Sequence, residues 1–265
     1  QRTAVVGTEA ALGALRGEIG DPVTLTLRRP TEEDSFTVTL TRALIDIPSV
    51  SHRWLIPGLA YLRITQFQTH TGEDLRAALA TLKGEQTLAG LVLDLRNNPG
   101  GVLSSGVAVA DAFLDGGLIV ETRGRGAGAN ERYEAQGGDL TGGAPVVVLI
   151  NEGTASASEI VAGALQDHGR GLLLGQRSFG KGSVQTLMPL SETRALKITT
   201  ARYYTPSGRS IQAQGIVPDL QGRGLGALRE RAPATREADL PGHLDAPGEA
   251  ALGGLPPFMD EDELL

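Results

Sequence analysis

Residues Pro145-Val-Val-Val-Leu-Ile-Asn-Glu-Gly-Thr-Ala-Ser-Ala-Ser-Glu159 join an apolar run to a segment of helical pattern. The apolar run predicts a buried strand over 145–150, and the pattern after the turn predicts a helix over 156–168. Neighbouring segments extend this alternation with a strand over 88–95 and helices over 71–83 and 107–114. Because apolar strands alternate with helices, we expect an α/β layer architecture.

Further strands are predicted on both sides of this central region. They cover 60–67 and 172–174, with an antiparallel pair at 183–190 and 195–204. At the N-terminal end, residues 8–16 predict a short helix, and 23–28 with 36–41 alternate with period two and predict a hairpin. Residues 221–265 hold nine acidic residues and four arginines, so we expect an acidic, loosely docked tail rich in Pro and Gly.

The composition excludes several classes of protein. With 40% apolar and 21% charged residues, the chain of 265 residues has enough apolar side chains for a sizeable core. Its net charge of −7 argues against a nucleic-acid partner, and no apolar run is long enough to predict a transmembrane segment. The absence of cysteine excludes thiol catalysis and Cys-ligated zinc. No histidine or carboxylate spacing suggests a metal, so we expect no metal and no other cofactor.

Ser156 is the first residue suited to catalysis, because it lies on a predicted strand-to-helix turn. A serine hydroxyl there projects beyond the sheet edge, and the first amides of the helix can stabilise an oxyanion. The structural alternative is an N-cap, since Ser156 and Glu159 have the spacing of a capping box. This segment alone leaves both interpretations open.

Lys181 is one of only three lysines among 24 basic residues. Lysine can lose its proton and act as a general base, which arginine cannot do. The flanking Gly180 and Gly182 let other backbone approach and exclude water from the amine. The alternative is a solvated lysine in a glycine turn, and the spacing does not fit a Walker motif.

The third segment, Asp94-Leu-Arg-Asn-Asn-Pro-Gly-Gly101, lies at the carboxyl end of the predicted strand over 88–95. Its two glycines can turn backbone N–H groups toward a developing negative charge. By itself, the segment favours the alternative of an ordinary Pro-Gly turn.

Taken together, the three segments resemble the carboxyl-terminal processing (tail-specific) proteases, which are Ser/Lys peptidases of the S41 group. The matching blocks are Asp94–Gly101, Gly153-Thr-Ala-Ser-Ala-Ser-Glu-Ile160 and Gly180-Lys-Gly-Ser-Val-Gln185, with closing segments Tyr203–Gln212 and Gly215-Ile-Val-Pro-Asp219. The blocks follow in the family's order from about residue 1 to residue 220. The resemblance implies a serine endopeptidase that cleaves proteins at or near their C-terminal regions through an acyl-enzyme. It also implies an α/β core of the crotonase-like (ClpP/crotonase) type over 46–220.

The resemblance also implies a role for individual residues. Ser156 would be the nucleophile, Lys181 the general base, and Gln185 the residue that orients the amine. Ser158, two residues later, is the competing nucleophile. The oxyanion hole would be formed by backbone amides, those of Gly100 or Gly101 together with that of Ala157. Such chemistry needs a neutral Lys181 amine, and no Asp or Glu occurs between 175 and 190.

The N-terminal residues and the cellular setting are likewise interpreted by resemblance. Residues 1–45 resemble the second half of a PDZ domain, and the first half, with its carboxylate-binding loop, is not in the sequence given. The family implies protein or peptide substrates with apolar C-termini, bound by strand addition. It also implies the periplasm, reached by an exported bacterial protein whose signal peptide is not in this chain. A homo-oligomer or a regulatory adaptor is compatible with the family.

Two other functions compete with a peptidase. One is a non-catalytic peptide-binding or scaffold protein of the same fold, and the other is a non-peptide ester hydrolase that uses the same site. We also expect the tail beyond Leu220 to be dispensable for the chemistry.

Overall fold

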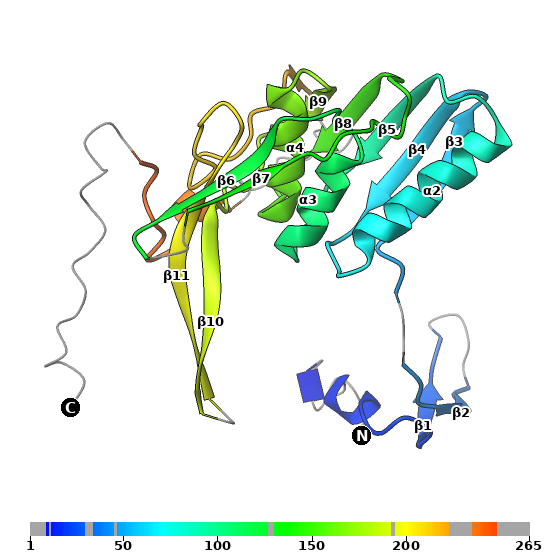
Figure 1. Cartoon of the computed structure of the whole chain (residues 1–265). Coiled ribbons are helices and arrows are strands. Elements are labelled where there is room, and N and C mark those ends of the chain that lie inside the picture. Colours follow the sequence, from blue (N-terminus) through cyan, green and yellow to red (C-terminus); the bar gives the residue numbers. More distant parts are fainter. Residues whose placement is uncertain are drawn as a thin grey trace, which may run out of the picture. The chain divides into compact units, whose positions relative to one another are not determined.

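The computed structural model describes residues 9–10, 12–29, 34–44, 47–126, 130–191, 194–222 and 235–247. The chain divides into two units, Gln1–Pro48 and Ser49–Leu265. The described residues of the larger unit form two sheets, three α-helices and a short 3-10 helix (Figure 1).

The main sheet of the larger unit has the strand order β12-β9-β8-β5-β4-β3. From β4 to β12 neighbouring strands pair parallel, and β3 pairs antiparallel with β4 at the edge. The bounds are β3 Val50–Ile56, β4 Leu59–Ile64, β5 Gly90–Asp94, β8 Val146–Ile150, β9 Gly171–Gly175 and β12 Leu220–Gln221. Because β5 and β8 are parallel neighbours, the turns that follow them lie side by side at one edge of the sheet.

Three helices, α2 (Thr71–Glu85), α3 (Leu103–Asp111) and α4 (Ala157–Asp167), cover one face of this sheet (Figure 1). Strand residues such as Leu62 and Val148 are fully buried in the core beside helix residues such as Leu79. Each such side chain contributes about 1.5–3 kcal/mol to the free energy of unfolding. This core holds the ends of the strands, and therefore the turns after them, in fixed positions.

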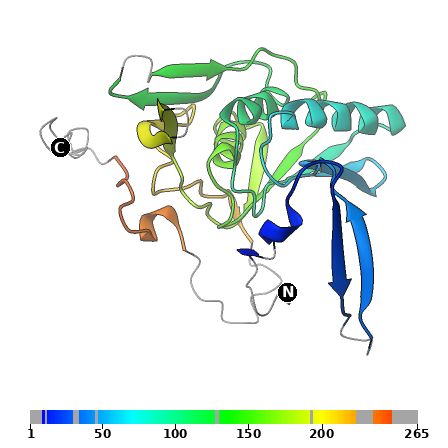
Figure 2. The ribbon, with the colours of Figure 1, turned by 90° about the horizontal axis from the view of Figure 1, so that it is seen from below.

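A second, antiparallel sheet has the order β10-β11-β6-β7. Its strands are β6 Leu118–Gly124, β7 Glu131–Glu134, β10 Ser183–Ser191 and β11 Arg194–Tyr204. Helix α4 contacts both β9 and β6, and α3 also contacts β6; in Figure 2 the β6–β7 strands lie on the helix side of the main sheet. Only residues 201–204 of β11 pair with β6, so the rest of β11 pairs with β10 alone and the two strands extend as a hairpin.

The smaller unit contains a two-stranded sheet of β1 (Pro22–Leu27) and β2 (Phe36–Thr41), paired antiparallel with Leu27 opposite Phe36. Residues 12–15 are helical. The Arg42 guanidinium donates hydrogen bonds to the carbonyl oxygens of Ala14, Leu15 and Pro22. This side chain therefore ties the helical residues to the hairpin.

Several elements differ from the sequence prediction. Helix α3 begins at Leu103, four residues before the predicted start, although Ser104, Ser105 and Gly106 favour turns. Gly106 faces α4, where an added Cβ would lie 3.1 Å from the Ala157 Cβ, so close helix packing overrides the local preference. The sequence analysis did not predict the strands β3, β6, β7 and β12. Residue 8 of the predicted first helix and much of the tail lie outside the described residues.

Candidate active site

Ser156 is the N-cap of α4 and has φ 55° and ψ −118°. A positive φ is uncommon for a residue with a side chain, and such a backbone costs about 1–3 kcal/mol. The turn before it is fixed by Thr154, whose buried Oγ1 accepts from the Asn151 N–H (3.0 Å) and donates to the Leu95 oxygen (2.8 Å). Ser156 is thus held in a backbone conformation that is unfavourable for a residue with a side chain. Strand-to-helix turns that present a nucleophilic serine are strained in a similar way.

The predicted alternative nucleophile, Ser158, lies in a different environment. Its side chain is fully buried, and its Oγ donates to the backbone oxygen of Asn98 at 3.0 Å. Ser156, in contrast, is partly exposed. Ser158 therefore joins α4 to the turn after β5, and of the two serines only Ser156 is partly exposed.

The turn after β5 lies directly against Ser156. A Cβ added to Gly100, which has φ +93°, would lie 2.8 Å from the Ser156 Cβ and 2.9 Å from the Ala157 nitrogen. A Cβ added to Gly101, which has φ +144°, would lie 2.0 Å from the Phe67 oxygen. Only glycine fits at these two positions, because Gly100 lies against the start of α4 and Gly101 lies against the Phe67 backbone.

The amides of this turn are not equivalent. Gly100 N–H donates to the Asn98 Oδ1 at 2.9 Å, so this donor is already used. Within the residues that the structure describes, the N–H groups of Gly101 and Ala157 donate to no protein acceptor. Of the two glycine amides expected as oxyanion donors, only that of Gly101 has no protein acceptor among the described residues.

Asn98 holds this arrangement together from inside the protein. Its side chain is fully buried, and its Nδ2 donates to the Ile64 oxygen at the end of β4 (2.9 Å). Its backbone oxygen accepts from the Ala155 N–H (2.9 Å) as well as from Ser158. One residue thus connects β4, the Gly100–Gly101 turn and the turn before α4.

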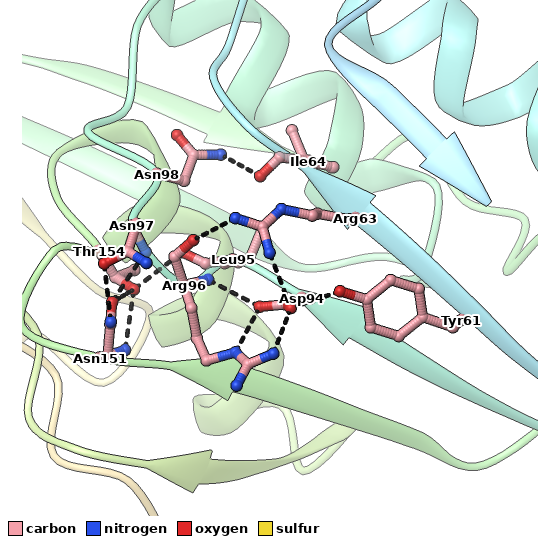
Figure 3. A network of polar contacts seen from close by, with 10 residues as sticks. All are labelled: Tyr61, Arg63, Ile64, Asp94, Leu95, Arg96, Asn97, Asn98, Asn151 and Thr154. Carbon is pink, nitrogen blue, oxygen red and sulfur yellow. Dashed lines mark hydrogen bonds and ion pairs between the residues drawn. The ribbon is translucent and has the colours of Figure 1, made fainter. Parts of the chain in front are cut away.

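A charged network anchors the start of the same turn (Figure 3). The fully buried Asp94 carboxylate accepts from the Tyr61 hydroxyl (2.6 Å) and, in bidentate fashion, from the Arg96 Nε (2.9 Å) and Nη2 (2.7 Å). Burial by itself would raise the pKa of Asp94, but the hydrogen bonds from Arg96 and Tyr61 outweigh it and hold this pKa below its usual value. Beside the network, the side chains of Asn97 and Asn151 bond to each other at 2.9 Å.

Lys181 lies in a short irregular segment, residues 178–182, that we call the lysine loop. Gly180, before the lysine, has φ +98°, which suits glycine. Among the described residues, no carboxylate oxygen lies within 4.0 Å of the Lys181 amine. A carboxylate does contact this residue, that of Glu159, but through the Lys181 backbone N–H.

Glu159 connects the lysine loop to the serine turn. Its fully buried Oε2 accepts from the N–H of Ser156 and from the N–H of Lys181, each at 2.8 Å. Its Oε1 accepts from the Ser178 hydroxyl (2.5 Å) and from the Gly180 N–H (2.7 Å). Burial raises the pKa of Glu159 to about 7, although these four hydrogen bonds act in the opposite direction.

Glu159 is the residue whose importance the sequence analysis missed. The capping-box spacing correctly predicted its bond to the Ser156 amide. That local motif carries no information on residues 178–181, which come from a distant part of the chain. The signal that was available is a lone carboxylate in an otherwise uncharged first turn, Ala-Ser-Glu-Ile-Val over 157–161.

Gln185, the third predicted side chain, is exposed on β10. The register of β10 against β11 shifts between Val184 and Gln185, because Val184 lies opposite Ala201 and Gln185 opposite Thr199. Such a bulge re-aims the side chains beside it. Gln185 follows Lys181 by four residues in the sequence. In the structure it lies on the strand that leaves the lysine loop.

The sequence profile of "Peptidase family S41" matches residues 58–221, which include the serine turn, the Gly100–Gly101 turn and the lysine loop. The chain belongs to peptidase family S41. It is 50% identical to a carboxy-terminal-processing protease of Bartonella bacilliformis, over 95% of this chain and 59% of that protein. It is 39% identical to the chloroplastic C-terminal processing peptidase of Tetradesmus obliquus, over 78% of this chain and 47% of that protein. This S41 chain thus spans about half the length of the curated relatives it matches.

Solved structures agree with the family assignment. A photosystem II D1 C-terminal processing protease matches with a TM-score of 0.60 and 39% identity, over 78% of this S41 chain and 56% of that one. A lipoprotein from Streptococcus agalactiae has the same fold, with a TM-score of 0.54 at 18% identity over 66% of each chain. Across the described residues, none of the helices combines the length and apolar character that crossing a membrane requires.

Proposed function

We propose that this chain is the catalytic part of a serine endopeptidase that cleaves proteins at or near their C-terminal regions. Its membership of family S41 and its similarity to carboxyl-terminal-processing proteases support this proposal. The observation that carries it is the buried Glu159 carboxylate, because its Oε2 accepts from the amides of both Ser156 and Lys181. Because the backbone nitrogens of Ser156 and Lys181 each lie 2.8 Å from the same oxygen, they are separated by no more than twice that distance.

In the proposed reaction Ser156 is the nucleophile and Lys181 the general base. The neutral amine takes the hydroxyl proton while the serine oxygen bonds to the scissile carbonyl carbon. The C–N bond of the substrate then breaks, and the Lys181 ammonium gives its proton to the leaving amine. A water molecule, deprotonated by the same amine, attacks the acyl-enzyme, and the proton returns to Ser156 as the acid is released.

We assign the stabilisation of the negative charge on the tetrahedral intermediate to the backbone N–H groups of Gly101 and Ala157. Both N–H groups are without a protein acceptor in the described chain, whereas that of Gly100 is bonded to Asn98. Ala157 is also the first residue of α4, where the helix dipole favours negative charge. Loss of one such donor typically costs about 10²–10³-fold in kcat.

Gln185 is assigned the role of orienting the Lys181 amine. It lies on β10 beside the register shift, on the strand that begins directly after the lysine loop. Its amide oxygen can accept a hydrogen bond from the amine and so direct the lone pair of the nitrogen toward Ser156.

The wider interpretation rests on the family resemblance. We propose a crotonase-like core and, in the smaller unit, the second half of a PDZ domain, whose hairpin β1–β2 fits that expectation. The substrates proposed are proteins or peptides with apolar C-termini. Relatives are bacterial or are named chloroplastic, which supports an exported or lumenal protein, and for a bacterial chain the periplasm. A homo-oligomer or an adaptor that regulates the site is proposed on the same basis.

Hydrolysis of an unfolded protein by the chain and by its Ser156→Ala variant tests the proposal. Mass spectrometry of the products should show cleavage near the C-terminus by the unmodified chain and none by the variant. A fluorogenic ester offered in parallel separates a peptidase from an ester hydrolase. Ester turnover without protein cleavage, or no turnover of either substrate, would contradict the proposed peptidase and favour one of the two competing functions.

A further inference from the structure

A second loop, residues 211–216, packs backbone to backbone against the lysine loop. A Cβ added to Gly182 would lie 2.2 Å from the Gln212 nitrogen. Ala213 N–H donates to the Gly180 oxygen at 2.8 Å, and Ala213 has φ 59°. Ala213 therefore has a strained backbone conformation. This strain costs free energy of folding, yet the loop keeps its close fit to the lysine loop.

Gln212, in the centre of this second loop, is fully buried, and both ends of its amide are bonded. Its Oε1 accepts from the Gly182 N–H at 3.1 Å. Its Nε2 donates to the Leu244 oxygen at 2.9 Å and to the Glu237 Oε1 at 3.4 Å. A buried side chain that satisfies every polar atom in this way fixes the groups it bonds.

The partners on the far side of Gln212 belong to residues 235–247, which we call the strap. The strap includes a short 3-10 helix at Glu237–Asp239. Besides its bonds to Gln212, it contacts the lysine loop directly, because the Glu237 N–H donates to the Phe179 oxygen at 3.2 Å. The strap therefore reaches the lysine loop on both sides of Lys181, at Phe179 directly and at Gly182 through Gln212.

We propose that Gln212 is a positioning residue for the reaction, and that the strap acts through Gln212 and Phe179 to hold the lysine loop in its catalytic conformation. This inference rests on the proposed role of Lys181 as the base. It assigns a task to the segment Tyr203–Gln212 and to part of the acidic tail, neither of which the proposed chemistry uses directly.

The physical reason lies in the two glycines around Lys181. Glycine restricts the backbone less than any other residue, so Gly180 and Gly182 leave the lysine free to move unless outside contacts hold it. Glu159 bonds the N–H groups of Gly180 and Lys181 from the α4 side. Gln212 bonds the next N–H, that of Gly182. Each of three successive amides thus has a buried side-chain acceptor.

Substitution of Gln212 tests the first part of the inference. Gln212→Met keeps the length of the side chain and removes both polar atoms. We expect hydrogen–deuterium exchange in a peptide that covers 178–185 to become at least about tenfold faster, because Gly182 N–H loses its acceptor. We expect kcat to fall on the order of 10–100-fold with little change in KM, since a shift of about 1 Å in a reacting group has such an effect. Unchanged exchange and unchanged kcat would overturn the proposal.

Glu237 provides a matched pair for the strap. Glu237→Pro deletes the N–H that donates to Phe179, and the extended Arg236 before it, with φ −115° and ψ 169°, accepts a following proline. Glu237→Ala keeps this N–H and removes only the weaker side-chain contact. We expect faster exchange of the lysine loop and a larger loss of kcat in the proline variant than in the alanine variant.

A double variant distinguishes positioning from general stability. If the strap and Gln212 act on the same loop, Gln212→Met with Glu237→Pro should lose less activity than the product of the two single effects. Full multiplication of the two effects would contradict a shared action. The exchange measurement needs no substrate, so it tests the strap independently of the proposed function. A chain that cleaves nothing would contradict the proposed function. Unchanged exchange in the variants would contradict the proposal that the strap holds the lysine loop.

Discussion

At the scale of single residues, the site depends on one carboxylate more than on any other group. Glu159 accepts hydrogen bonds from the two segments that carry Ser156 and Lys181. Ser156, Lys181 and the paired glycines could be singled out from the sequence, because each stands in a recognisable local context. The buried bonds of Glu159, Asn98 and Gln212 were not, since each joins residues that are far apart in the chain.

The first prediction concerns the proton that Lys181 is proposed to accept. Lys181→Arg keeps a positive charge but replaces an amine that can give up its proton with a guanidinium that cannot. We expect kcat to fall by about 10²–10⁴-fold, the usual contribution of a general base, with an unchanged circular dichroism spectrum. Lys197→Arg, at an exposed position of β11, is the matched control and should retain full activity. Comparable activity in both variants would exclude Lys181 as the base.

The second prediction concerns the pH dependence of stability. Burial raises the pKa of Glu159 from 4.5 to about 7 in the folded chain. Between these values the folded chain holds a proton that the unfolded chain has released, so this group makes the folded state less stable as pH rises through that window. The effect on the free energy of unfolding reaches at most about 3 kcal/mol.

Urea unfolding at pH 5 and pH 8 measures this effect. The unmodified chain should lose more stability between these pH values than Glu159→Gln, which cannot ionise. Equal losses in both chains would show that Glu159 does not titrate in this range. Asp94 does not confuse the comparison, because its lowered pKa places its titration below pH 5.

At the scale of elements, the ends of β5 and β8 build the site, and Asn98 links them. Replacing Asn98 by alanine leaves the Gly100 N–H without its acceptor in a buried turn. We expect a loss of about 1–3 kcal/mol in the free energy of unfolding, together with a lower kcat. Asn130→Ala is the control, because it removes a similar bond to the Gly124 N–H at an exposed position and should leave kcat unchanged. Equal effects of the two substitutions would refute a special role for Asn98.

The elements that were predicted correctly are those with strong local patterns. The apolar runs of β5 and β8, the helix α4 and the antiparallel strands β10 and β11 lie where the sequence placed them, within a few residues. The strands β6 and β7 lack such a pattern. They are stabilised by pairing in a sheet that joins distant segments, and the local sequence does not reveal this pairing. The late predicted start of α3 has a similar origin, since Gly106 packs closely against Ala157 of α4, a contact that the local sequence does not reveal.

At the scale of the whole molecule, the acidic tail is the part whose interpretation changes most. The sequence predicted a tail without a role in the chemistry, on the basis of its charge and weak periodicity. The described residues 235–247 instead contact Phe179 and Gln212. A chain that ends at Gly222 retains β12, and we expect it to fold and to lose at least about tenfold in kcat. Full activity of this truncated chain would contradict a role for the strap and would confirm the sequence prediction that the tail is dispensable for the chemistry.

The central claim is that Ser156 is a nucleophile activated by Lys181, and covalent labelling tests it most directly. A fluorophosphonate probe forms a stable phosphonyl ester with an activated serine, and peptide mass spectrometry locates the ester. The account predicts a single adduct on Ser156 in the unmodified chain, and none in Ser156→Ala or Lys181→Arg under the same conditions. An adduct on Ser158, or equal labelling of Ser156 in the Lys181→Arg variant, would contradict it.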